Sequence, residues 1–208
     1  MLEVYFCDFS VVNDNDCGNL RDKIAFHFSD KAGLKRKDSV CAKAMLCQLL
    51  YEKFNIKSFV VDCEEDGKPY LVGREICFNL SHSEKIALCS VSDETVGCDV
   101  EKIRVYNPKV AKRFFTDEEF NLLEKSDNQD LMFTRLWTMK ESILKCLGTG
   151  LSGGLSEYDF SSVINENFFM AHNLCFNLFE FPEYVICVCS RVNEKLTYPV
   201  KIEISVHE

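Results

Sequence analysis

Hydrophobic and polar positions along the 208-residue chain form two kinds of pattern. Apolar residues at steps of three and four, among them Val40, Ala44 and Leu50, predict a helix over residues 38–54. Short apolar runs bounded by turn residues predict strands instead. The expected strands cover residues 2–9, 56–62, 76–80, 86–91, 96–103, 168–181, 184–192 and 198–206.

Two other segments differ sharply in their helical signals. Residues 107–125 are expected to contain two helices, the second beginning at Thr116, because Glu119 follows at the spacing of a capping box. Residues 11–37 are polar and show no sustained period. We therefore expect them to be irregular, apart from a short helix near residues 23–28.

A long helix is expected over residues 130–147, where apolar side chains again recur with helical spacing. Ser126 and Gln129 repeat the capping-box spacing ahead of it. Glycines are typical of helix ends, and four of them are expected to end this helix. They are Gly148, Gly150, Gly153 and Gly154.

The order of these elements predicts an α+β fold, because strands and helices do not alternate as regular βαβ units. At roughly 150 residues per domain, a chain of this length forms one large domain or two small ones. Either arrangement can bury a substantial core.

Charge and composition exclude several classes of protein. The chain has 24 basic and 33 acidic residues, a formal net charge of −9, which is unsuitable for a general nucleic-acid binder. No apolar run approaches the roughly 18 residues that a membrane span needs. The first residues lack the basic start of a signal peptide. We therefore expect a cytoplasmic protein without nucleic-acid or membrane partners.

The chain contains 12 cysteines but no C-x-x-C pair, so the sequence supports neither a zinc ribbon nor a thioredoxin-like motif. Most of the cysteines lie within apolar segments. We expect them to be reduced residues of the core, as in other proteins of a reducing compartment.

The segment 96–102 carries the first candidate chemistry. Side chains alternate along a strand, so Gly97, Asp99 and Glu101 share one face. Carboxylates two residues apart repel each other unless solvent or a cation lies between them. Mg²⁺ prefers such oxygen ligands. The alternative is a half-buried strand with a solvated acidic face.

Three further segments hold polar side chains of interest. Glu141 and Lys145 are neighbours on one helix surface, and the plain alternative is a surface ion pair. His82 follows a predicted strand with serines on both sides, and a structural histidine is the alternative. Lys68 lies in a Gly-Lys-Pro-Tyr turn and is expected to be exposed, or the segment is only a β-turn. No G-x-S-x-G elbow is present, so a serine hydrolase is not indicated.

The order of these motifs resembles the 4′-phosphopantetheinyl transferase superfamily. G-K-P, N-x-S-H-S, G-x-D-x-E-K and W-x-x-K-E-x-x-x-K occupy residues 67–69, 79–83, 97–102 and 137–145. Lys112-Arg113-Phe114-Phe115 between the last two also resembles the family. The similarity is to the longer, single-chain enzymes of surfactin-synthetase-activating (Sfp-like) type, and it covers roughly residues 36–155.

The resemblance implies a reaction and its participants. Members of the family transfer the 4′-phosphopantetheine arm of coenzyme A to a serine of an acyl or peptidyl carrier protein, with release of adenosine 3′,5′-bisphosphate. The resemblance implies Mg²⁺ as cofactor, with Mn²⁺ as an alternative. The nucleophilic serine belongs to the carrier, which agrees with the missing elbow. Charge neutralisation and in-line positioning dominate such phosphoryl chemistry.

The family's roles transfer to matching positions of this chain. Asp99, Glu101 and Glu141 are expected to hold the metal, and Glu141 also to act as general base, directly or through a water. Lys145 and His82 are expected to act on the phosphates of coenzyme A. Its adenine and phosphates are expected to contact Lys68, Pro69, Ser81 and Ser39, with Arg36 preferred among Lys31, Lys35, Arg36 and Lys37 for the 3′-phosphate.

The implied fold is a pair of similar α+β halves related by a pseudo-twofold axis, residues 1–98 and 99–208, in a monomer. Coenzyme A and the metal would lie between the halves. Because carrier proteins are usually acidic, a local basic patch formed in part by Lys109, Lys112 and Arg113 is a candidate docking surface.

Two rival functions remain on the sequence alone. One is a binding module that kept the fold and lost the transfer activity. The other is a different Mg²⁺ enzyme acting on a nucleotide. The presence of Glu141 and Lys145 weakens the first, and the absence of a P-loop excludes a P-loop nucleotide hydrolase.

Overall fold

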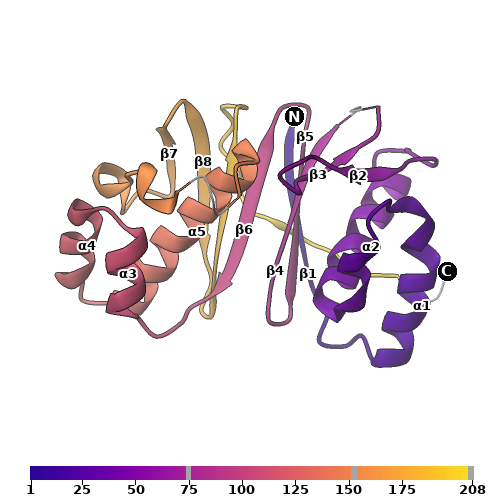
Figure 1. The fold of residues 1–208 in the computed structure, drawn as a ribbon, viewed down its shortest axis with the longest axis horizontal. Coiled ribbons are helices and arrows are strands. Elements are labelled where there is room, and N and C mark those ends of the chain that lie inside the picture. Colours follow the sequence, from indigo (N-terminus) through magenta and orange to yellow (C-terminus); the bar gives the residue numbers. More distant parts are fainter. Residues whose placement is uncertain (74–75, 151–153, 206–208) are drawn as a thin grey trace.

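A computed structural model describes residues 1–73, 76–150 and 154–205 (Figure 1). The first of two four-stranded sheets has the order β10-β1-β5-β4. Its central strands pair antiparallel, whereas β10 runs parallel to β1. The strands are β1 (Leu2–Asp8), β4 (Cys77–Ser83), β5 (Ile86–Ser92) and β10 (Val200–Lys201).

The second sheet is antiparallel throughout and has the order β6-β9-β8-β7. The chain enters it directly from β5 through the turn before β6, and later returns to the first sheet at β10. Its strands are β6 (Val96–Lys102), β7 (Phe168–Ala171), β8 (Leu174–Glu180) and β9 (Tyr184–Ser190).

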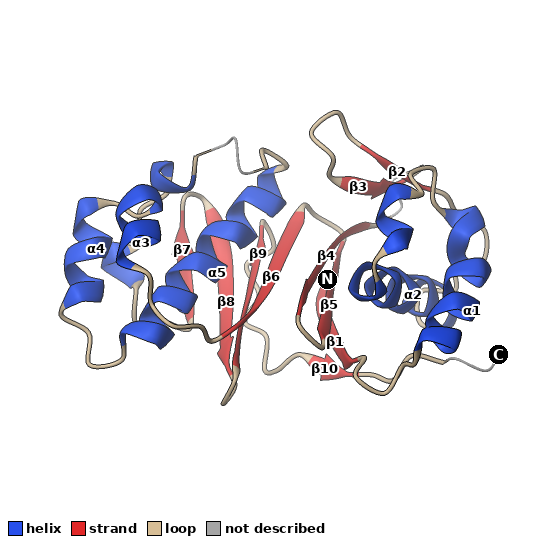
Figure 2. Ribbon diagram, turned by 60° about the horizontal axis from the view of Figure 1, so that its bottom comes forward, coloured by secondary structure: helices blue, strands red, loops and turns tan. Residues whose placement is uncertain are grey.

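Helices cover the outer faces of both sheets, so the molecule has the layer order helix, sheet, sheet, helix (Figure 2). The first sheet carries α1 (Asp14–Ile24) and α2 (Lys37–Glu52), and the second carries α3 (Pro108–Phe114), α4 (Asp117–Glu124) and α5 (Gln129–Leu147). Short pieces complete the described chain: the hairpin β2 (Val61–Cys63) and β3 (Pro69–Leu71), and the 3₁₀ turns Ala25–His27, Ala32–Lys35, Leu155–Glu157 and Ser161–Val163.

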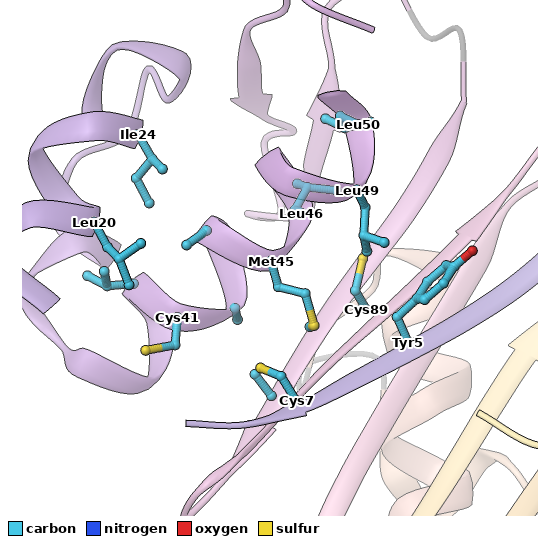
Figure 3. Packing of buried hydrophobic residues seen from close by; sticks show 14 of the residues in the cluster. Tyr5, Cys7, Leu20, Ile24, Cys41, Met45, Leu46, Leu49, Leu50 and Cys89 are labelled. Carbon is cyan, nitrogen blue, oxygen red and sulfur yellow. The ribbon is translucent and has the colours of Figure 1, made fainter. Parts of the chain in front are cut away.

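Three hydrophobic clusters correspond to these layers. In the first, Met45 and Leu49 of α2 point toward Cys7 and Cys89 of the first sheet (Figure 3). A second cluster fills the space between α5 and the second sheet. The third lies between the two sheets and includes Val4, Leu88, Val96, Cys98, Val100 and Val188. Burial of this apolar surface is the main contribution holding the sheets together.

The predicted α+β class is confirmed, and so are the predicted helix over residues 38–54, the capping box at Thr116 and the glycine end of the long helix. The predicted helix at 38–54 is α2. The capping box at Thr116 and Glu119 is formed in both directions. The long helix is capped by Asn128, so the expectation that Ser126 begins it was wrong. Gly148 ends it in the left-handed region, with φ of 75°.

Several segments differ from the sequence expectation. Residues 11–37 were expected to be irregular, yet they contain α1, whose buried side chains are Cys17, Leu20 and Ile24. The strand expected at 56–62 is restricted to β2. The strand expected at 168–181 is a hairpin turning at His172 and Asn173, both with positive φ.

Other expectations concern the C-terminal segment, the glycines after α5 and the cysteines. The strand expected at 198–206 is reduced to β10, and residue 206 lies outside the described residues, as does Gly153. Nine of the twelve cysteines are buried, so their predicted role in the core is confirmed. Within the described ranges, no helix is both long and apolar enough to cross a membrane.

Gly97 allows α5 to lie directly on β6. A Cβ atom at this position would stand 2.2 Å from the backbone nitrogen of Cys146 and 2.2 Å from the carbonyl oxygen of Ser142. Both are backbone atoms of α5, so they cannot move aside without shifting the helix. The glycine therefore fixes the distance between β6 and α5, the helix that carries Glu141 and Lys145.

We expect Gly97→Ala to destabilise the protein by an amount at the upper end of the roughly 1–3 kcal/mol that overpacking usually costs. Urea unfolding measures the change. Gly18→Ala is the matched control, because nothing lies within 4 Å of its Cβ position in the interior of α1. That control should gain roughly 0.5–1 kcal/mol. Equal stability of wild type and Gly97→Ala would contradict the packing argument.

Candidate active site

The candidate site forms where β4 and β6, the neighbouring edge strands of the two sheets, run side by side (Figure 2). Side chains of β4 accept hydrogen bonds from backbone N–H groups of β6 at alternate residues. Asn79 Oδ1 accepts from Cys98 at 2.9 Å, Ser81 Oγ from Val100 at 3.4 Å, and Ser83 Oγ from Lys102 at 3.1 Å. We call these six residues the β4–β6 junction.

Side chains alternate along β6, so one face of the strand packs between the sheets and the other faces α5. Cys98 and Val100 point into the cluster between the sheets. Gly97 faces α5. Asp99 and Glu101 lie on the same face of the strand as Gly97, as the sequence predicted.

Asp99 is the buried centre of the site, with 3% of its surface exposed. Its Oδ1 accepts hydrogen bonds from Ser81 Oγ at 2.8 Å and from Lys145 Nζ at 2.7 Å. Its Oδ2 is buried and has no hydrogen-bond partner among the described residues. An unpartnered carboxylate oxygen in a buried position is costly, so it marks a place where a cation would be stabilised.

Glu101 is held at both carboxylate oxygens. Ser83 Oγ donates to Oε2 at 3.2 Å, and Arg104 Nη2 lies 2.6 Å from Oε1. Burial raises the pKa of Glu101, and repulsion from Asp99 raises it further, against the attraction of Arg104. The guanidinium of Arg104 also lies 5.4 Å from the centre of the Trp137 ring.

Glu141 and Lys145 reach the same place from α5. Burial raises the pKa of Glu141 to about 7, and repulsion from Asp99 and Glu101 adds to that effect. Burial by itself would lower the pKa of Lys145, but the adjacent Asp99 carboxylate outweighs it and the pKa is raised. The structure thus brings three carboxylates and one ammonium group into mutual electrostatic contact.

This donor set is suited to a hard divalent cation. Asp99, Glu101 and Glu141 supply only oxygen ligands, and their repulsion is relieved by added positive charge. Within the described chain, no three His, Cys, Asp or Glu side chains already surround one point as metal ligands. Instead, Lys145 pairs with Asp99, and Arg104 pairs with Glu101.

His82 lies on β4 beside the N-terminus of α2. Its Nδ1 is 3.5 Å from Oδ2 of Asp38, and Arg36 pairs with the same carboxylate. Burial lowers the pKa of His82, with Asp38 opposing and Arg36 reinforcing the shift. Ser39 follows in the first turn of α2, where its backbone N–H donates to Asp38. The predicted residues at 36, 39 and 82 are therefore neighbours.

Lys68 is half-buried, not exposed as predicted, and it connects the β2–β3 hairpin to β6 and α5. Its Nζ donates to the carbonyl oxygens of Cys146, at 2.7 Å, and of Val96, at 3.2 Å. Burial lowers its pKa. A cleft of about 220 Å³ runs past Lys68, Pro69 and Lys145. Lys68 and Pro69 thus line the same cleft as Lys145, the residue that pairs with Asp99.

Four contacts of the site were missed by the sequence argument. Asp38 partners His82, Ser83 and Arg104 hold Glu101, and Glu119 forms a fully buried ion pair with Lys140 at 2.8 Å. In the sequence, Asn79, Ser81 and Ser83 alternate with other residues and so form a polar face of one strand. Arg104 is only three residues from Glu101, whereas nothing local indicates that Asp38 contacts His82 or that Glu119 contacts Lys140.

Comparisons with known proteins indicate the family that this chain resembles. A family model described as the 4′-phosphopantetheinyl transferase superfamily matches residues 95–189. The resemblance predicted from the motifs is confirmed. The matched region includes Asp99, Glu101, Glu141 and Lys145, whereas β4 lies before it.

Curated 4′-phosphopantetheinyl transferases are similar over part of their length. The protein gsp of Aneurinibacillus migulanus is 36% identical over 118 residues, covering 52% of this chain and 49% of that protein. Sfp of Bacillus subtilis strain 168 is 37% identical over 98 residues, covering 46% and 44% respectively. The chain spans about half the length of the curated relatives it matches.

Two more distant similarities complete the comparison. The L-aminoadipate-semialdehyde dehydrogenase-phosphopantetheinyl transferase of Saccharomyces cerevisiae is 31% identical over 159 residues, covering 66% of this chain and 57% of that protein. The crystal structure of Thermotoga maritima holo-[acyl-carrier-protein] synthase matches at 18% identity with a TM-score of 0.37, covering 46% of this chain and 61% of that one. That score is too low to carry an argument.

The environment of His82 predicts a pH dependence of stability. Because burial lowers its folded-state pKa below the unfolded value, the unfolded chain takes up the proton first as pH falls through 6.5. We therefore expect the His82→Asn variant to lose less stability than wild type between pH 7.5 and about pH 5.5. Urea midpoints at both pH values measure this difference, and His172→Asn is the control. A wild-type loss no larger than that of His82→Asn would contradict the prediction.

Proposed function

We propose that this protein transfers the 4′-phosphopantetheine group of coenzyme A to a serine hydroxyl of an acyl or peptidyl carrier protein. The Oγ–P bond forms as the P–O bond to the adenosine bisphosphate breaks, which releases adenosine 3′,5′-bisphosphate. The observation that carries the proposal is that Asp99, Glu101, Glu141 and Lys145 lie close enough to interact electrostatically, and that Oδ2 of Asp99 is buried with no hydrogen-bond partner among the described residues. The family similarity supports it.

The proposed metal ligands are Asp99, Glu101 and Glu141, with Mg²⁺ preferred and Mn²⁺ as an alternative. When bound, the ion would neutralise charge on the pyrophosphate and act as a Lewis acid. The support from this chain is chemical: an all-oxygen donor set, repulsion among its members, and a buried oxygen that has no hydrogen-bond partner in the described part of the chain.

Glu141 is the proposed general base for the carrier's serine, directly or through a water. Without a bound cation its pKa is raised to about 7, so the carboxylate accepts a proton more readily than an ordinary glutamate does. Burial and the neighbouring carboxylates cause this shift. The proton of the serine hydroxyl thus passes to the Glu141 carboxylate as the oxygen attacks phosphorus.

Coenzyme A is proposed to lie along the cleft between Lys68 and Lys145, with its phosphates toward Lys145, His82 and Ser81. Lys145 offsets phosphate charge, as its raised pKa keeps it cationic. The remaining proposed contacts are Pro69 and Lys68 with the adenine side, and Ser39 and Arg36 with the 3′-phosphate. Arg36 is suited to this contact because its side chain is 71% exposed.

The internal symmetry of the fold, its oligomeric state, its compartment and its carrier-docking surface are also proposals. We propose similar halves, residues 1–98 and 99–208, related by a pseudo-twofold axis, in a cytoplasmic monomer. The helix, sheet, sheet, helix order supports this symmetry (Figure 2). Lys109, Lys112 and Arg113 are exposed on α3, which supports their proposed role in docking an acidic carrier.

Incubation with coenzyme A, Mg²⁺ and an apo carrier protein tests the function, with intact mass of the carrier as the readout. We expect a gain of one phosphopantetheine group on the carrier serine. Carriers of fatty-acid and peptide synthesis should both be tried. The absence of any gain with all of them would refute the proposal.

Replacement of the base separates binding from transfer. Glu141→Gln should bind coenzyme A, measured by calorimetry, but transfer about a hundredfold more slowly or worse, because general-base catalysis typically contributes that much. Glu94→Gln, in an exposed turn, makes the same chemical change and should retain full activity. Full activity of Glu141→Gln would rule out its role as base.

A further inference from the structure

Ser83 contacts both the backbone of β6 and one of its carboxylates. Its Oγ accepts the N–H of Lys102 at 3.1 Å and lies 3.2 Å from Oε2 of Glu101. A hydroxyl has a single hydrogen to donate, and the carboxylate oxygen can only accept. With the backbone N–H as donor on one side, the hydroxyl hydrogen is directed to Glu101 on the other.

The same two-sided contact occurs two residues earlier. Ser81 Oγ accepts the N–H of Val100 and donates to Oδ1 of Asp99. The spacing is constant, since each serine contacts the carboxylate eighteen positions later and the N–H nineteen positions later. The β4–β6 junction therefore sets the orientation of both carboxylates on β6.

Asn79 makes only one of the two contacts that the serines make, the one with the backbone of β6. It accepts the N–H of Cys98 at 2.9 Å, as the serines do for their partners. The residue before Cys98 is Gly97, which has no side chain to orient. Asn79 thus joins the two strands without orienting a carboxylate of β6. By comparison, the hydrogen bond from Ser83 to Glu101 is not needed to join the strands.

We propose that Ser83 is a positioning residue for the metal site, which fixes Glu101 so that its carboxylate faces Asp99 and Glu141. Arg104 holds the other oxygen, Oε1, at 2.6 Å, but its long side chain is 45% exposed to solvent. Ser83 has a short side chain on β4, so its hydroxyl stays within a smaller distance of the strand backbone. The proposal rests on the proposed function, because it assigns Ser83 a role toward the cation of that site.

Removing this hydroxyl has a predictable consequence. Residues that orient metal ligands usually change metal affinity by 10- to 100-fold when they are replaced. In Ser83→Ala, Oε2 of Glu101 loses its fixed donor, and the pairing with Arg104 becomes its main restraint. In Ser83→Thr the hydroxyl is kept, so the donor is restored at the same place on β4.

The test measures Mn²⁺ binding by the full chain, with free Mn²⁺ counted by electron paramagnetic resonance, with and without coenzyme A. We expect Ser83→Ala to bind about tenfold more weakly than wild type, and Ser83→Thr to bind within about twofold of it. Asn79→Ala is the matched control, since it should lower the urea midpoint while leaving Mn²⁺ affinity within about twofold. In the transfer assay, the Mn²⁺ requirement of Ser83→Ala should rise while the KM for coenzyme A stays unchanged.

Each contrary outcome points to a different error. Wild-type affinity in Ser83→Ala would overturn the positioning role and leave the proposed function standing. An equal loss of affinity in Asn79→Ala would show that strand docking, not the carboxylate contact, is responsible, and would also overturn it. If wild type binds no Mn²⁺ under either condition, the metal site itself is refuted, and the role of Ser83 with it.

Discussion

The backbone N–H groups along the open edge of β6 must find partners, because the strand is buried between two layers. Asn79, Ser81 and Ser83 provide them from β4, in place of a backbone ladder. The rest of the site depends on this constraint. The oxygen of each serine hydroxyl accepts a hydrogen bond from β6. Its hydrogen is therefore left to be donated, by Ser81 to Asp99 and by Ser83 to Glu101. The junction that joins the sheets therefore also orients the carboxylates.

A second constraint is the excess of negative charge in a small buried volume. Two cationic side chains now offset it: Lys145 at Asp99 and Arg104 at Glu101. Among the described residues, no salt bridge joins Glu141 to a cationic side chain, and burial together with the neighbouring carboxylates raises its pKa. The close approach of α5 at Gly97 brings Glu141 and Lys145 to the strand. Packing and electrostatics thus act together at one place, where a divalent cation would be favoured.

How much the sequence could predict depends on how local each signal is. The capping box at Thr116 and the end of α5 at Gly148, the first of the four glycines expected to end it, depend on neighbours in the chain, and both were predicted correctly. The shared face of Asp99 and Glu101 follows from strand alternation alone. The helix α1 was missed because its buried stripe of Cys17, Leu20 and Ile24 is sparse among polar residues. Lys68 was expected to be exposed, yet its oxygen partners lie 28 and 78 residues away, and no local pattern indicates such contacts.

The central claim is that the carboxylates of β6 and α5 form a single cation site governed by the β4–β6 junction. A crystal structure of the full chain with Mn²⁺ and coenzyme A, phased to show anomalous scattering from manganese, tests it most directly. The account predicts one strong peak contacted by Asp99, Glu101 and Glu141, with Ser83 still bonded to Glu101. A peak elsewhere, or a site where Lys145 and Arg104 still pair with both strand carboxylates and no manganese lies between them, would contradict it.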